Sequence, residues 1–266
     1  MQGSYQFSKA LANAFVSSSS VFSQPRTLRD SNADWNLSPW DVPNSFKLDW
    51  IYELPFGHGK MWLNGTNDLV NKVIGNWQIG GVTRWQSGQS YLMNGGRLTV
   101  NQFDAGVVLH GITRQELQKS VNIRKDPSGI VYFLPQSLIN NTMAAFGNAP
   151  AGVNFDPSAP YIGPPTTPGV LGDRIVLHGP WTQRWDLNIM KRIPITETVN
   201  IEGRVSFLNA FNRANFYLGG ADNTVNTISA NGTSFGQTRS AYRDITVSGT
   251  NDPGGRLIEW QFRINF

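Results

Sequence analysis

The sequence predicts an all-β fold whose antiparallel strands cross a membrane, and three features support this prediction. The final segment, 257–266, alternates apolar and polar side chains to the end of the chain. Charged residues make up only 15% of the chain and aromatic residues 12%, whereas a soluble domain has about a quarter charged residues. Glycine and proline are frequent, with 27 and 15 copies, which indicates many turns and loops.

The final segment shows the alternation most clearly. Its apolar side chains are Ile258, Trp260, Phe262, Ile264 and Phe266, and its polar ones are Glu259, Gln261, Arg263 and Asn265. Successive side chains of a strand point to opposite faces, and about ten residues tilted by roughly 45° cross the hydrocarbon of a bilayer. We therefore expect one face of this strand to contact lipid, in a piece of an outer-membrane β-barrel.

Composition excludes several other classes of protein. No apolar run approaches the roughly 18 residues of a transmembrane helix. Basic residues are scattered along the chain, so nucleic acid is not an expected partner. Cysteine is absent, which excludes disulfides and cysteine-based metal sites. The histidines, His58, His110 and His178, lie far apart in expected turns or loops, so neither a metal nor another cofactor is expected.

Long strands are expected over residues 4–16, 45–55, 76–92, 181–193, 197–211 and 256–266. Their connections alternate between long ones (17–45, 93–180, 212–255) and shorter ones (56–75, 194–196). Outer-membrane barrels have long extracellular loops and short periplasmic turns. We therefore expect the long connections to lie outside the cell and the C-terminus to lie on the periplasmic side.

Short helices are expected within the connections, over 67–74, 114–120 and 135–146. The first carries its apolar residues on one side, namely Leu69, Val70, Val73 and Ile74. The second follows from Thr113 and Glu116, which have the spacing of a capping box. Gly75 and Gly147 are stop signals for the first and third. The proline-rich stretch 150–180 is expected to lack regular structure.

The strand face opposite the apolar one is charged and polar, which suits the wall of a wet or protein-filled lumen. Its charged members are Lys47, Asp49, Glu53, Arg184, Asp186, Arg192, Glu202, Arg204, Glu259 and Arg263. The expected strands are too few to close a barrel, which needs about eight, and no signal peptide precedes them. Residues 1–266 are therefore interpreted as the C-terminal portion of a longer barrel, without its plug domain, signal peptide and remaining strands.

Two carboxylates of this wall, Asp186 and Glu202, are expected on neighbouring strands. Paired carboxylates can perform acid–base catalysis. Three arginines stand beside them, however: Arg184, Arg192 and Arg204. We therefore expect charge compensation rather than catalysis, and no enzymatic activity.

Aromatic residues near the strand ends invite two interpretations. The residues in question are Trp50, Tyr52, Trp77, Trp181 and Trp185. Aromatic rings stack on sugars, but Trp and Tyr also form girdles where a barrel meets the two membrane interfaces. The girdle is the favoured interpretation and sugar binding the alternative.

Two adjacent stretches, 185–197 (WDLNIMKRIPITE) and 201–216 (IEGRVSFLNAFNRANF), together resemble the C-terminal barrel of TonB-dependent transporters. They are most similar to the Oar-like group, which has an N-terminal carboxypeptidase-regulatory-like domain. Residues 52–57 (YELPFG), 75–81 (GNWQIGG) and 235–237 (FGQ) are similar to further stretches of that group. The stretch Leu208-Asn209-Ala210 departs from the pattern, because a second Phe is usual in this part of the motif.

This resemblance implies a barrel of about 22 strands, plugged by an N-terminal domain and located in the bacterial outer membrane. The TonB complex would act through the missing plug and energise uptake of a large or scarce, unidentified solute. The other implied partners are outer-membrane lipid and the barrel-assembly machinery. The resemblance implies that this machinery recognises the terminal strand through Trp260, Phe262, Ile264 and Phe266.

Two alternatives stay open at this point. A secreted or surface β-rich module for adhesion or carbohydrate binding would bury its aromatic stripe, and its strands would average about five or six residues. A passive, porin-like barrel differs from a transporter only in the missing N-terminal region. The long strands disfavour the first alternative and the motifs disfavour the second.

Overall fold

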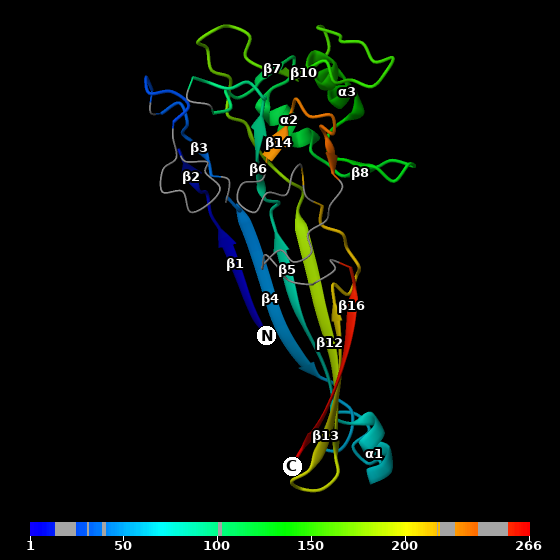
Figure 1. Cartoon of the computed structure of the whole chain (residues 1–266). Coiled ribbons are helices and arrows are strands. Elements are labelled where there is room, and N and C mark those ends of the chain that lie inside the picture. The colour runs from blue at the N-terminus through cyan, green and yellow to red at the C-terminus, as the bar shows by residue number, and fades with distance from the viewer. Residues whose placement is uncertain are drawn as a thin grey trace.

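The computed structural model describes residues 1–13, 25–30, 32–38, 41–100, 103–216, 218, 227–238 and 255–266. It has two parts that follow one another along a long axis (Figure 1). We call them the wall, which is the sheet of long strands, and the cap, which comprises the described residues among 25–38, 87–180, 218 and 227–238. The chain passes between the two parts several times.

The wall is a 6-stranded antiparallel sheet. In spatial order its strands are β1 (Gln2–Phe7), β4 (Asn44–Glu53), β5 (Trp77–Gln86), β12 (Thr182–Pro194), β13 (Asn200–Leu208) and β16 (Leu257–Asn265). Aromatic and β-branched residues alternate with polar ones along these strands, which favours the extended, pleated conformation. Among the described strands, β1 and β16 form the two edges of the sheet.

Two of the expected strands are wrong in extent. Residues 14–16 of the expected strand 4–16 lie outside the described residues, and the rest of it divides into β1 and β2 (Leu11–Ala12); β2 pairs with β3 (Asn36–Leu37) instead of joining the wall. The segment 76–92 divides into β5 and β6 (Ser90–Asn94), and β6 lies in the cap. The chain turns between them at Gly88, where an added Cβ would lie 2.1 Å from the carbonyl oxygen of Gly179. Close backbone approach therefore ends the wall strand.

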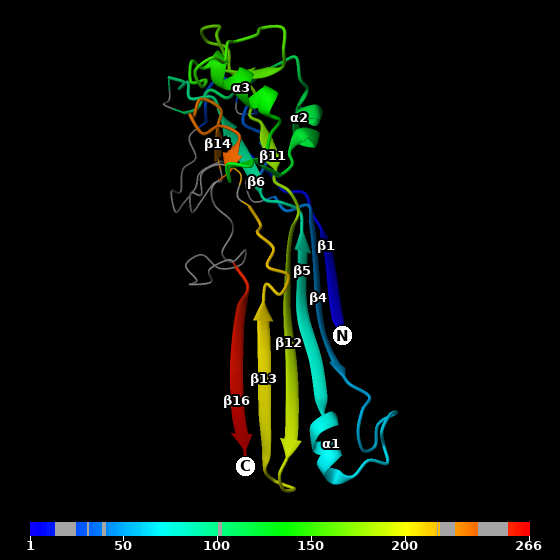
Figure 2. The same cartoon turned by 90° about the vertical axis from the view of Figure 1, so that its right-hand side faces the viewer.

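The connections lie as their lengths predict (Figure 2). The turn after β12 and the segment with α1 (Asp68–Ile74) lie at the end away from the cap, whereas most of the described residues of the longer connections belong to the cap. The other helices, α2 (Arg114–Ser120) and α3 (Gln136–Ala145), also match their predicted positions. The capping box is formed: the Glu116 amide donates to Thr113 Oγ1 at 3.2 Å and the Thr113 amide to Glu116 Oε2 at 2.8 Å.

The cap contains small sheets that the sequence did not predict. They are β11 (Val176–His178), β6 and β14 (Thr227–Ser229); β10 (Tyr161–Gly163) and β7 (Val108–His110); and β15 (Gln237–Thr238), β9 (Val131–Tyr132) and β8 (Arg124–Lys125). The expectation that 150–180 lacks regular structure is therefore wrong. Pro160 and Pro164 flank β10 instead of interrupting it, so their missing amide hydrogens remove nothing from the ladder.

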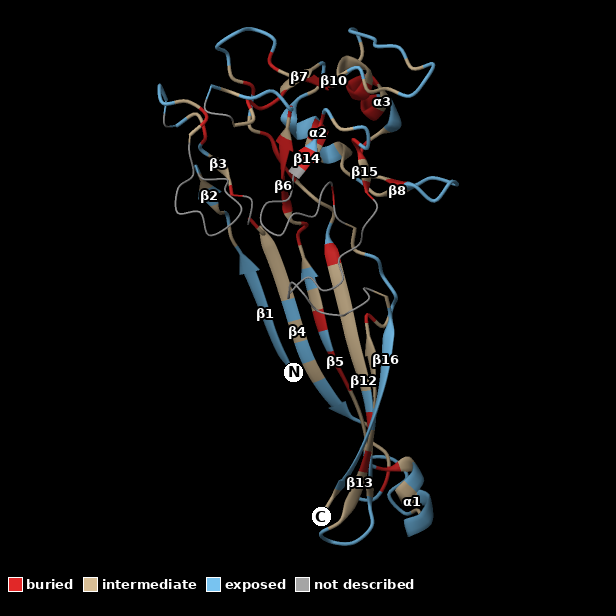
Figure 3. Ribbon diagram, viewed as in Figure 1, coloured by how far each residue is buried: buried red, intermediate tan, exposed pale blue. Residues whose placement is uncertain are grey.

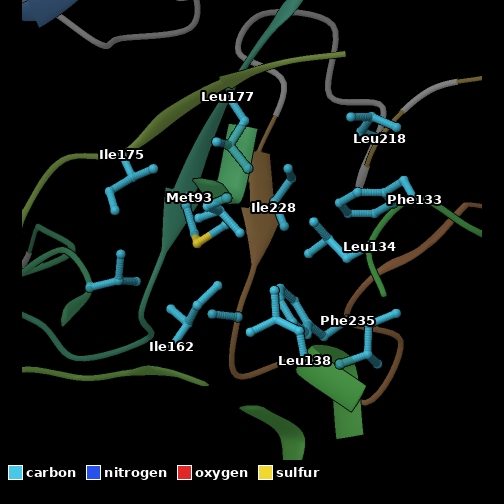
Figure 4. Close-up of a cluster of buried hydrophobic side chains, with 14 of the residues drawn as sticks. Met93, Phe133, Leu134, Leu138, Ile162, Ile175, Leu177, Leu218, Ile228 and Phe235 are labelled. Atoms are coloured by element: carbon cyan, nitrogen blue, oxygen red, sulfur yellow. The ribbon is translucent and has the colours of Figure 1, made fainter. Parts of the chain in front are cut away.

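The cap also has a hydrophobic core of its own (Figure 4). Its fully buried members include Tyr91, Met93, Phe133, Leu134, Ile162, Leu177 and Ile228. Tyr91 lies at the end of the expected strand 76–92, and the others come from segments expected to be polar or irregular loops. These connections therefore form a folded unit. Of the helices in the described residues, none is long and apolar enough to cross a bilayer.

Candidate functional site

Two clefts open on the surface of the cap and share Arg26 and Leu171. The first has a volume of about 790 Å³ and lies between segments 26–29, 97–100 and 165–171. The second, of about 640 Å³, lies between segments 33–36, 109–114 and 171–175. Each volume is in the range of a small-molecule binding pocket. The clefts are therefore the candidate solute-contacting surface of the described residues.

A buried ionic cluster separates the two clefts. Arg26 Nε donates to Asp34 Oδ1 at 2.6 Å, and Arg174 Nε donates to the same oxygen at 2.8 Å. The guanidinium of Arg26 also donates to the carbonyl oxygens of Ala33, Ala105 and Gly172 at 2.7–3.1 Å. Arg26 and Asp34 are 4% and 2% exposed. One side chain thus joins segments that are far apart in the sequence.

The cluster keeps its carboxylate ionised. Burial of Asp34 favours the neutral form, but hydrogen bonds from Arg26 and the positive charge of Arg174 outweigh this effect. The pKa of Asp34 therefore lies below its ordinary value of 3.8. Because the charge of Arg26 is balanced in this way, the cluster is a fixed support for the cleft walls.

The first cleft combines cationic and aliphatic groups. Arg29 and Arg97 line it together with exposed aliphatic side chains, and its described lining residues include no Asp or Glu. Arg97 Nη1 donates to the Pro165 carbonyl at 3.0 Å, so this guanidinium is held across the cleft. The second cleft presents Trp35, which is 57% exposed, beside Arg114.

One arrangement in the cap resembles a catalytic triad. His178 Nε2 lies 3.5 Å from Asp41 Oδ2, and His178 Nδ1 lies 3.4 Å from Ser90 Oγ. Ser90 is fully buried, however, and its hydroxyl donates to the Asp41 carbonyl at 3.0 Å. A nucleophile must reach its substrate, so these residues are suited to holding the segment before β4 onto β6 and β11.

The strand register places all ten predicted wall residues on one face of the sheet. Lys47 is opposite Arg84, which is opposite Arg184, and Arg192 is opposite Glu202, which is opposite Arg263. The expected charge compensation is confirmed by three ion pairs: Arg184–Asp186 at 3.0 Å, Arg192–Glu202 at 3.4 Å and Arg204–Glu202 at 3.4 Å. That this face lines a lumen stays a prediction.

The aromatic residues lie on the opposite face. Trp50, Tyr52, Trp77 and Trp185 share it by register, together with Trp260, Phe262 and Ile264 of the predicted assembly signal. Trp181 lies just before β12 rather than in it, and Phe266 follows β16. Figure 3 shows that the wall has few buried residues. Both the girdle role and the assembly role stay predictions.

Sequence reasoning missed the ionic cluster and the clefts. Arg26 and Asp34 lie in a polar segment without periodicity, and Arg174 is remote in sequence. Proline content correctly indicated that the segment around 165 is irregular, but nothing in it indicated a cleft. Among the described residues, no group of three or more His, Cys, Asp or Glu side chains is placed to hold a metal ion.

Comparison with known proteins adds one decisive observation to the alternating faces of the wall. A family model described as "Outer membrane beta barrel domain" matches residues 1–246. The chain belongs to this outer-membrane β-barrel family. Neither the curated proteins nor the solved structures gave a match. This family member is therefore located in the bacterial outer membrane. That the apolar face of its wall contacts lipid stays a prediction.

Proposed function

We propose that the chain is the C-terminal part of a TonB-dependent transporter that takes up a large or scarce solute. The observation that carries the proposal is the charge-compensated face of the wall, because such a face suits a wet or protein-filled lumen. The residue patterns at 185–197 and 201–216 support an Oar-like transporter with a plug and a carboxypeptidase-regulatory-like domain outside this chain.

The cap suits the capture step of such a transporter. Its first cleft offers the guanidinium groups of Arg29 and Arg97 beside aliphatic walls, which favours a solute with an anionic group and an apolar part. Trp35 in the second cleft offers a ring for stacking. In this proposal the cap binds the solute and the energised plug admits it, and no catalysis takes place.

Two measurements on the intact protein from outer membranes test the proposal. A TonB-dependent transporter cross-links to the purified periplasmic domain of TonB and, because its lumen is plugged, conducts little current in a planar lipid bilayer. A passive porin conducts steadily and does not cross-link to TonB. Steady conductance without cross-linking would contradict the proposal and favour the porin.

The adhesion alternative predicts a third result. A surface module that only binds carbohydrate through its cap would neither cross-link to TonB nor conduct. It would retain glycans on an array, and Trp35→Ala would abolish that retention. Because Trp35 is an exposed side chain in the cleft, this substitution is expected to leave the cap folded.

A further inference from the structure

The helix α1 at the lower end of the wall exposes the apolar side that its sequence predicts. Leu69, Val70 and Val73 are 77%, 42% and 68% exposed. Asn67 Oδ1 caps the N-terminus of the helix by accepting from the Val70 amide at 2.8 Å, and on another side Asn71 Oδ1 holds the helix to the preceding segment by accepting from the His58 amide at 2.9 Å. The apolar side therefore points away from the protein.

Two side chains fix the C-terminal end of α1 to the wall. The Val73 carbonyl accepts from Trp77 Nε1 at 2.9 Å and from Lys191 Nζ at 2.9 Å. Lys191 Nζ also donates to the Gly75 carbonyl. Trp77 and Lys191 are direct partners in the β5–β12 ladder, and the same row continues through Gly203 to Phe262. This row is on the apolar face, which is predicted to contact lipid, so α1 is attached to that side of the wall.

The contact between Lys191 and the C-terminal end of α1 has a clear physical reason. A lysine ammonium on a lipid-facing surface is costly unless it finds a partner. The last carbonyls of a helix have no partner within the helix and carry partial negative charge. Lys191 and the C-terminal end of α1 therefore satisfy one another, and their contact holds the helix where the wall leaves the hydrocarbon.

We propose that α1 is an interfacial helix whose apolar side enters the lipid at the boundary between headgroups and acyl chains. The leaflet that the apolar side of α1 enters is the one at the periplasmic ends of the strands. The surface is continuous with the apolar face of the wall, where Phe262 is 76% exposed. The apolar side chains at 69, 70 and 73 are then covered by lipid, which explains their exposure in the isolated chain. The placement of α1 rests on the outer-membrane location of the family, and it does not depend on the proposed transport function.

Spin labelling of the intact protein tests this placement. The chain has no cysteine, so Leu69→Cys and Val73→Cys each introduce one labelling site into residues 1–266, and any cysteine elsewhere in the intact protein is replaced by serine. The labelled proteins are reconstituted into vesicles of phosphatidylethanolamine and phosphatidylglycerol. Collision rates with dissolved oxygen, which concentrates in lipid, and with a water-soluble nickel chelate are then measured by electron paramagnetic resonance.

Two reference positions bracket the result. Ile189→Cys reports the lipid-facing middle of β12, and Glu197→Cys reports the exposed turn at the same end of the wall as α1. The ratio of oxygen to nickel collisions at 69 and 73 is expected to be several-fold above that at 197 and to approach that at 189. A ratio equal to that at 197 would overturn the proposal. Shielding from both reagents would also overturn it, because a protein partner would then cover the helix.

Discussion

The wall and the cap place the same kinds of apolar side chain in opposite ways. On the wall, Trp260 and Phe262 are 69% and 76% exposed, whereas in the cap Tyr91 and Phe133 are 1% and 0% exposed. The wall satisfies its backbone by long ladders, and its exposed apolar face is predicted to contact lipid. The cap, predicted to lie in water, buries its apolar residues within itself. One chain thus uses two different means of stabilisation.

The cap compensates for its irregular backbone with side-chain hydrogen bonds. Asn141 Nδ2 donates to the carbonyl oxygens of Asp156 and Ala159 at 2.8 and 3.1 Å, and its Oδ1 accepts from the Asp156 amide at 2.9 Å. The Arg26 guanidinium binds carbonyls of several segments in the same way. Without long ladders, polar side chains take over the role of satisfying buried backbone groups.

The largest effect is expected from Phe266→Asp, which changes the end of the wall. Phe266 is 98% exposed and belongs to the predicted assembly signal. The charge should abolish assembled barrel while synthesis continues, as measured by the heat-modifiable band in outer membranes. Gln261→Glu adds the same charge on the polar face and should assemble normally. Normal assembly of the Phe266 variant would show that the last residue does not act as a signal.

The next largest effect is expected from Phe133→Ala in the cap core. Removing this fully buried ring should destabilise the cap by roughly 3–5 kcal/mol. Hydrogen exchange and limited proteolysis should show local opening of the cap while the barrel keeps its heat-modifiable band. Leu28→Ala, at a position 84% exposed, is the matched control and should have little effect. Loss of the barrel in the Phe133 variant would mean that wall and cap form one cooperative unit.

Asp34→Asn should also destabilise the cap, with a characteristic dependence on pH. At neutral pH the change leaves buried arginine charge uncompensated, at a cost of roughly 3–5 kcal/mol. Folding lowers the pKa of Asp34 below its ordinary value of 3.8. The contribution of its carboxylate to the stability of the cap is therefore fully present above pH 3.8 and is lost as the pH falls through the pKa of the folded protein.

Proteolytic protection of the cap, measured from pH 7 to pH 3, checks this expectation. The difference in proteolytic protection of the cap between wild type and Asp34→Asn should be constant down to about pH 5 and should become smaller below that pH. Other carboxylates titrate equally in both proteins, so the difference isolates Asp34. A gap that is independent of pH would show that the carboxylate charge is not what stabilises the cluster.

The smallest effect is expected from Gly81→Ala in the wall. An added Cβ at Gly81 would lie 2.8 Å from Leu187 Cδ2 and 3.2 Å from Trp50 Cε2. This overpacking should cost about 1–3 kcal/mol, seen as a lower temperature at which the heat-modifiable band is lost. Gly203→Ala is the control, because its nearest atom, Phe262 Cδ1 or Cε1, lies no closer than 3.5 Å. Equal effects at both positions would exclude crowding by Trp50 as the cause.

Much of the wall was predictable because its signals are local. Alternation along 45–55 and 256–266 identified strands and assigned each side chain to a face, and the register then brought the predicted charged residues together. The capping box at Thr113 and Glu116 identified α2 in the same way. These features depend on neighbours within a few residues, which the sequence displays directly.

The boundary of β5 was not predictable, because Trp77 to Leu92 continues in a strand-like pattern across the turn. Only the close approach of Gly179 to Gly88 decides where the wall strand ends. The same holds for the clefts, whose walls come from three separate segments each. Contacts of this kind can be predicted only when the positions of residues that are distant in sequence are known.

By itself, therefore, the sequence determined the membrane-spanning strands, their two faces and the end of the molecule at which the long connections lie. Tertiary structure alone decided that the described parts of these connections fold into a cap, that Arg26, Asp34 and Arg174 meet, and that α1 is attached to the apolar face of the wall through Lys191. The physical reason is that periodicity and helix capping depend on residues that are close together in the sequence. Burial and long-range ion pairs, in contrast, arise only when remote segments pack together.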